Sequence, residues 1–125
     1  MRIYRSDKNG IGIWRLAGVV GADDAKGIVL SLRASTERGS GCFILDFAAV
    51  KHVDYRAFGI LEEGFPEGAN VLLSGLSDYI LDILAFVMGR RPLAIFPDWR
   101  RAMRYLTVER GKLGSPLPAG SGRIG

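Results

Sequence analysis

The side chains best suited to chemistry stand between Asp46 and Gly59, where a buried apolar segment gives way to a predicted helix. His52 is the single histidine of the chain, and Asp54 follows it closely, so a carboxylate could orient the imidazole as a general base. Such a base needs a nucleophile or a polarised water, and no serine or cysteine neighbours His52 in the sequence. We therefore expect no catalytic residues and a protein that is not an enzyme.

The counts of metal-binding residue types argue against a resident metal or cofactor, and we expect neither. Cys42 is the only cysteine, and its place in an apolar segment predicts a small core residue. One cysteine and one histidine cannot build the usual zinc cluster, and they leave no intrachain disulfide. The chain also lacks the Gly-x-x-x-x-Gly-Lys-Ser/Thr loop that cradles phosphates. Nucleotide binding is therefore only a second alternative, suggested by Arg90-Arg91 and Arg100-Arg101.

Strands alternating with helices must position these residues. The patterns of apolar residues and turn signals predict strands at 3–4, 11–18, 42–47, 70–75 and 92–96, and helices at 22–37, 54–64, 77–88 and from 97 onward. Asn9-Gly10 predicts a tight hairpin between the first two strands, and residues 48–53 are predicted to be a loop. This alternation indicates an α/β domain with a sheet that is at least partly parallel. In such sheets, sites gather where central strands end and the next helices begin.

Length and composition indicate one ordinary domain with a basic end. The chain has 125 residues, of which 48% are hydrophobic and 24% charged. Residues 1–110 are expected to form the domain, and residues 111–125 a flexible basic tail containing Gly, Pro and Ser. Residues 90–125 hold 8 Lys/Arg against 2 Asp/Glu, whereas residues 1–89 hold 9 against 11. Such an end is usually a solvated helix face, although it could touch nucleic acid, a membrane surface or an acidic partner.

The setting expected from the sequence is cytoplasmic. The first eight residues lack the apolar stretch of a signal peptide, and no apolar run is long enough to span a bilayer. No recognisable nucleic-acid-binding motif is present. We expect neither direct membrane insertion nor a nucleic-acid partner.

Three stretches, in this order, resemble the STAS domain, a family shared by anti-sigma factor antagonists and the C-terminal domains of sulfate transporters. They are Cys42–Phe47 with Val53–Gly59, then Val71–Ser77, and last Leu93–Pro97 with Ala102. The likeness in order and spacing covers roughly residues 2–108. The resemblance implies a STAS-like mixed β-sheet of four to five strands with about four packing helices.

The chain departs from this family at the phosphorylation motif, Asp-Ser-Ser-Gly-Leu-Gly. In the family, a partner kinase that also acts as anti-sigma factor phosphorylates the second serine. Here Tyr55 and Arg56 stand at the two serine positions and Ala57 at the first glycine, so only Asp54 and Gly59 keep the motif. The resemblance therefore implies no phosphorylation at the usual serine position, Arg56.

A cation in the first helical turn opposes the helix dipole, so we expect an acidic group to compensate the charge of Arg56. Either it meets an acidic group of a partner, or it folds back onto Asp54 or Asp46. We expect a partner-binding surface without the serine switch, and its partner to be an anti-sigma factor or related regulatory protein. The alternative is an accessory STAS subunit of a membrane transport system. The expected binding residues are Asp54, Tyr55, Arg56, Ala57, Phe58 and Gly59.

The predicted helix at 77–88 is unusually apolar. Nine of the ten residues from Tyr79 to Met88 are apolar, and only Asp82 interrupts them. A helix on a sheet hides a stripe rather than its whole circumference, so some of Tyr79, Phe86 and Met88 should stay outside. They would then form a homodimer or partner face. The other interpretation is a helix wedged between the sheet and a neighbouring helix.

Overall fold

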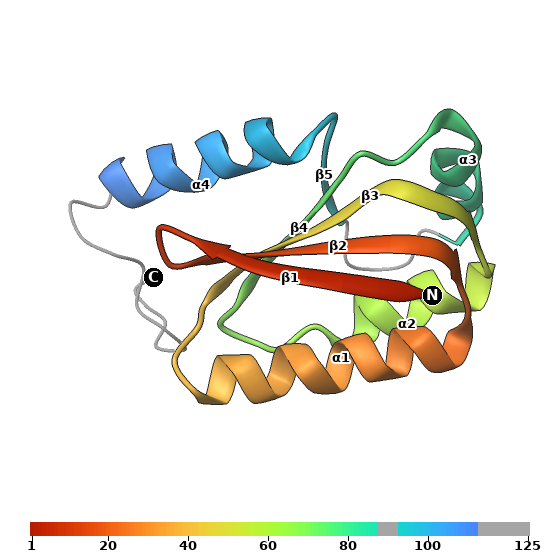
Figure 1. Cartoon of the computed structure of the whole chain (residues 1–125), viewed down its shortest axis with the longest axis horizontal. Helices are drawn as coiled ribbons and strands as arrows, with labels where there is room; N and C mark the ends of the chain where they lie inside the picture. The colour runs from red at the N-terminus through yellow and green to blue at the C-terminus, as the bar shows by residue number, and fades with distance from the viewer. Residues whose placement is uncertain (88–92, 113–125) are drawn as a thin grey trace.

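Five strands form one mixed sheet in the order β1-β2-β3-β4-β5, and four helices pack around it (Figure 1). The computed structural model describes residues 1–87 and 93–112, with side chains to residue 109. β1 is antiparallel to β2, and the other strand pairs are parallel. The predicted α/β class and mixed sheet are confirmed. The elements are β1 Arg2–Lys8, β2 Ile11–Val20, α1 Ala22–Glu37, β3 Cys42–Val53, α2 Tyr55–Gly64, β4 Asn70–Ser74, α3 Asp78–Val87, β5 Ala94–Phe96 and α4 Trp99–Lys112.

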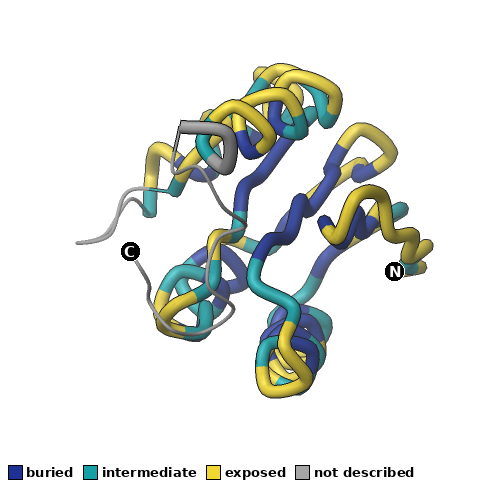
Figure 2. The backbone as a smooth tube through the Cα atoms, turned by 90° about the vertical axis from the view of Figure 1, so that its left-hand side faces the viewer, coloured by how far each residue is buried: buried dark blue, intermediate teal, exposed yellow. Residues whose placement is uncertain are grey.

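The sheet separates two hydrophobic cores. α1 and α2 cover one face and α4 the other, while α3 lies at the end of the sheet beside α2 (Figure 1). The larger core joins the first face to α1, α2 and α3, and the buried central strands run between the helices (Figure 2). The smaller core joins Ile13, Cys42 and Ile44 of the sheet to Ala102 and Leu106 of α4. Cys42 is 5% exposed, as expected of a core residue.

The N-terminal hairpin forms as its sequence predicts. Asn9 and Gly10 both have positive φ, 55° and 78°, which suits a tight turn between twisted strands. Side chains of β2 then alternate between the two cores, with Ile13 facing α4 and Trp14 facing α1. The alternation explains why both faces of this strand are apolar.

The predicted loop at 48–53 is wrong, because β3 continues to Val53. The added residues pair in parallel with Ala17–Val20 of β2, across two register shifts. Val50 and Val53 are buried by this pairing, at 7% and 0% exposure. Asp54 is consequently the only residue between the end of β3 and the start of α2.

Smaller differences concern the ends of the elements. β1 covers Arg2–Lys8 rather than residues 3–4 alone, and α4 continues to Lys112. Met88 and the start of the last predicted strand at Pro92 lie outside the described residues. Residues 113–125 also lie outside them, so the separate tail stays a prediction.

Gly64 provides a test of how tightly α2 packs on α1. A Cβ at Gly64 would stand 2.7 Å from both methyl carbons of Val29. Gly64→Ala should therefore lower the free energy of unfolding, because crowding costs about 1–3 kcal/mol. The gain from alanine as a helix former, roughly 1 kcal/mol, offsets only part of this cost. Urea unfolding of Gly64→Ala, Val29→Ala and the double variant measures the effect. The double variant should be more stable than the sum of the two single changes in the free energy of unfolding predicts. Changes that simply add would contradict the contact between Gly64 and Val29.

Candidate functional site

Asp54 begins α2 as its N-cap. Its backbone is extended (φ −62°, ψ 130°), and its Oδ1 accepts a hydrogen bond from the Arg56 backbone N–H at 3.0 Å. This bond satisfies one of the free N–H groups at the helix start. The helix start predicted at Asp54 is confirmed.

Arg56 folds back onto Asp54, which is one of the two alternatives left open by the sequence. Its Nη2 lies 2.6 Å from Asp54 Oδ2, and its Nε donates to Oδ1 at 3.1 Å. The carboxylate therefore offsets the conflict between the cation and the helix dipole. The Arg56 side chain remains 65% exposed, so its remaining donors face solvent. Asp46 is not its partner, because Asp46 is buried and accepts from Ser74 Oγ at 3.2 Å.

This pairing changes how Asp54 titrates. The Arg56 side-chain hydrogen bonds, followed by the Arg56 backbone N–H, lower the pKa of Asp54 from 3.8 to about 2. The side-chain hydrogen bonds to Asp54, followed by the charge of Asp54, raise the pKa of Arg56 above its usual value. Asp54 therefore stays ionised and paired at any pH above about 4.

We expect the carboxyl ¹³C signal of Asp54 to titrate with a midpoint of about 2. In Arg56→Gln the midpoint should rise toward 3.8, whereas Arg33→Gln on α1 should leave it unchanged. Because the folded pKa lies below the unfolded value, the stabilising contribution is present above about pH 4 and disappears as the pH falls through about 2. Asp54→Asn should lose this part of the pH dependence. A midpoint near 3.8 in the unmodified protein would contradict the pairing.

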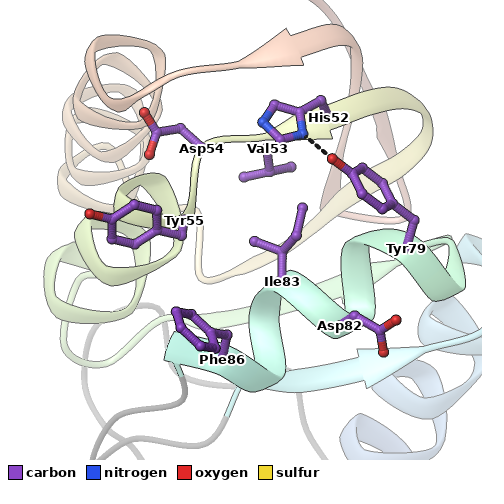
Figure 3. Close-up of a pocket in the computed structure, with 8 residues that line it drawn as sticks. All are labelled: His52, Val53, Asp54, Tyr55, Tyr79, Asp82, Ile83 and Phe86. Carbon is purple, nitrogen blue, oxygen red and sulfur yellow. Dashed lines mark hydrogen bonds between the residues drawn. The ribbon is translucent and has the colours of Figure 1, made fainter.

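An open groove of about 660 Å³ separates the start of α2 from α3 (Figure 3). The end of β3 and the first residues of α2 form one wall, and α3 forms the other. The lining residues are His52, Val53, Asp54, Tyr55, Tyr79, Asp82, Ile83 and Phe86. Tyr55 is 55% exposed and Phe86 is 85% exposed. Asp54 and Tyr55 of the expected binding residues thus line the same groove as Tyr79 and Phe86 of the apolar helix.

His52 is joined to the opposite wall of the groove. Its Nδ1 lies 2.6 Å from the Tyr79 Oη, and the two rings are 5.8 Å apart (Figure 3). Local sequence could not reveal this partner, because Tyr79 follows 27 residues later. Among the described residues that line the groove there is neither serine nor cysteine. The imidazole therefore has a phenol as its neighbour rather than a conventional acyl-transfer nucleophile.

Two of the expected binding residues are not on the surface. Ala57 and Phe58 are 0% and 1% exposed, and the Phe58 ring stacks on Phe47 with centroids 6.0 Å apart. The prediction that their side chains contact a partner is wrong, because they form the inward stripe of α2. Gly59 is half-buried. Tyr79 and Phe86 remain outside as expected, and Met88 lies outside the described residues.

Residues 1–87 and 93–112 offer neither a cluster of metal ligands nor a membrane-spanning helix. No group of three or more His, Cys, Asp or Glu side chains there is arranged to hold a metal ion. None of the helices in these residues is both long enough and apolar enough to cross a bilayer.

Comparisons with known proteins identify the architecture. Neither protein-family models nor curated protein sequences match the chain. The anti-sigma factor antagonist SpoIIAA of Bacillus, unphosphorylated, matches at TM-score 0.60 and 14% identity, over 85% of this chain and 98% of that protein. A serine-to-glutamate variant of RsbS from Moorella thermoacetica matches at TM-score 0.67 and 12% identity, over 89% and 99%. The murine anion transporter Slc26a9 matches at TM-score 0.64 and 17% identity, over 82% of this chain and 18% of the transporter. Likeness at these identities concerns the fold, and by its fold this chain is STAS-like.

Proposed function

We propose that this chain is a non-catalytic protein-binding module that regulates by docking to an anti-sigma factor or related regulatory protein in the bacterial cytoplasm. The main support is the groove, where Tyr55 at the start of α2 stands exposed across from Phe86 on α3. The exposed Arg56 follows Tyr55 in the sequence, outside the residues that line the groove. The likeness of the fold to that of an anti-sigma factor antagonist supports a regulatory role for protein binding at this groove. Docking would cover aromatic side chains that now face solvent.

The groove has the composition of a binding site for a protein. Tyrosine, phenylalanine and arginine are enriched at interfaces, where large rigid rings bury much area at little entropic cost. Tyr55 and Phe86 supply such rings on opposite walls. Arg56, the next residue after Tyr55, is 65% exposed although it is paired with Asp54. Asp82 adds a negative charge on the α3 wall. A complementary partner would place an apolar side chain between the rings and a cation near Asp82.

The proposed regulation requires no serine switch. The position that resembles the family's phosphoserine holds Arg56, whose guanidinium carries no acceptor hydroxyl and is paired with Asp54. A guanidinium held in this way presents a permanent positive charge at any physiological pH. Binding would therefore depend on the amount of the partner or on competition, rather than on modification at this position.

The absence of catalysis is part of the proposal. His52 is hydrogen-bonded to Tyr79, and the groove residues include no serine or cysteine. General-base catalysis would need a substrate proton within hydrogen-bonding reach of this imidazole. Turnover of ATP or GTP that disappears in His52→Ala would contradict the proposal.

Affinity capture with the full chain, followed by mass spectrometry and titration of the captured partner, tests the function. Phe86→Ala should weaken binding about 30-fold, as expected for an aromatic anchor at an interface. Leu30→Ala is the matched control, because Leu30 is 66% exposed on α1, across the sheet from α4 and away from the groove. A captured anti-sigma kinase supports the proposal, whereas captured transporter components support the alternative of an accessory transport subunit. Equal binding by Phe86→Ala and the unmodified chain would exclude the groove as the docking site.

A further inference from the structure

Three cations surround the indole ring of Trp99 at the start of α4. The guanidinium carbon of Arg100 lies 5.0 Å from the ring centroid, that of Arg15 5.6 Å, and Lys8 Nζ 5.8 Å. The residues come from α4, β2 and β1, so the fold gathers them from distant parts of the sequence. Each cation is attracted by the electrons of the ring face, which explains how one side chain can hold several of them.

These cations have no carboxylate partners among the described residues. The ion pairs of the described residues join Lys26 to Asp23, Arg56 to Asp54 and Arg101 to Asp98. Lys8, Arg15 and Arg100 are all exposed. Cations that are clustered without counter-charges create a positive potential in the solvent above them. This potential would attract an anionic partner.

The sheet beside the cluster adds an exposed amphipathic side chain, that of Tyr4. Tyr4 lies directly opposite Arg15 in the antiparallel pair, so both side chains are on the face covered in part by α4. Tyr4 is 54% exposed. The basic face, defined as Lys8, Arg15, Trp99 and Arg100 with Tyr4 beside Arg15, is thus cationic with an exposed aromatic side chain.

We propose that the basic face binds the surface of an anionic membrane, with its cations on headgroup phosphates and Tyr4 at the headgroup level. Tyrosine and tryptophan favour this interfacial region, and basic clusters are attracted by acidic lipids. A nucleic acid suits the face less well. The indole on which a base could stack already has the guanidinium groups of Arg15 and Arg100 over its ring.

Membrane binding of this kind is peripheral and leaves the proposed docking groove free. The groove is made by the end of β3, α2 and α3, whereas the basic face is made by β1, β2 and α4. Figure 1 shows α4 on the opposite side of the sheet from α1 and α2. The inference does not depend on the proposed function, and either can fail alone.

Co-sedimentation of the full chain with vesicles tests the inference. The chain should sediment with vesicles of equimolar phosphatidylglycerol and phosphatidylcholine, less so at high salt, and should stay in solution with phosphatidylcholine alone. The variant Lys8→Gln/Arg15→Gln/Arg100→Gln should bind about 100-fold more weakly, since each cation contributes roughly fivefold. Trp99 is kept in this variant because it packs against the smaller core.

The control Lys26→Gln/Arg33→Gln/Arg38→Gln removes the same charge from α1 and its C-cap residue, across the sheet from α4. It should bind within about threefold of the unmodified chain, because its cations face away from the vesicle. Equal losses in the two triple variants would mean that net charge alone drives binding, and would overturn the inference. Failure to bind the acidic vesicles would also overturn it. The inference would also be overturned if the chain bound a single-stranded DNA oligonucleotide through these three cations but did not bind the vesicles. Circular dichroism serves as the check that both variants are folded.

Discussion

Phe58→Ala should lower the free energy of unfolding by about 3–5 kcal/mol, enough to remove much of the stability of a domain this size. The Phe58 ring is 1% exposed and stacks on Phe47 inside the larger core. Alanine would leave a cavity between α2 and the sheet, because the surrounding strands can collapse only in part. Urea unfolding followed by circular dichroism measures the loss.

Phe86→Ala is the matched control for this experiment. The same side chain is deleted, but Phe86 is 85% exposed on α3. Its removal should change the free energy of unfolding by no more than about 0.5 kcal/mol. Similar losses for the two variants would contradict the assignment of Phe58 to the core and Phe86 to the groove.

Gly75→Ala should cost about 3 kcal/mol, through a different mechanism. Gly75 follows β4 with φ +72°, a left-handed conformation that costs other residues about 1–2 kcal/mol. Its Cβ would also stand 2.7 Å from Asp46 Oδ1 and 3.0 Å from the Ala48 backbone nitrogen. Because the crowded atoms include backbone, relief requires β3 to move, which adds roughly 1–3 kcal/mol. Thermal or urea unfolding measures the sum.

Gly59→Ala is the comparison for Gly75→Ala. Gly59 lies inside α2, and a Cβ there would meet nothing within 4 Å. Alanine should therefore stabilise the helix by up to about 1 kcal/mol. If both glycine variants changed stability in the same direction, the close approach of Gly75 to β3 would be in doubt.

The sequence predicted the fold wherever local signals agree with tertiary packing. The Asn9-Gly10 turn, the helix at 22–37 and the Asp54 cap all depend on neighbours close in the sequence. The length of β3 does not depend on such close neighbours. Residues 48–53 lack a regular alternation, and they are extended because β2 continues beside them across two register shifts. Only the partner strand shows why this segment pairs.

The candidate site was partly predictable for the same reason. The pairing of Arg56 with Asp54 spans two residues and was one of two alternatives available from the sequence. The groove lies between the start of α2 and α3, so its existence depends on how these two helices pack. The burial of Ala57 and Phe58 did have a local signal. Together with Leu61, they occupy one helical stripe, and that spacing predicts an inward face.

The order of the strands has a consequence for how the chain can acquire its structure during synthesis. Each strand lies beside the one that precedes it in the sequence, from β1 to β5. A sheet with this order can grow from one edge as the ribosome releases the chain, starting from the local hairpin of β1 and β2. No early strand has to wait for a late one to fill a gap between them. A stalled nascent chain would therefore expose one growing sheet edge at each stage, next to the segment that emerges next.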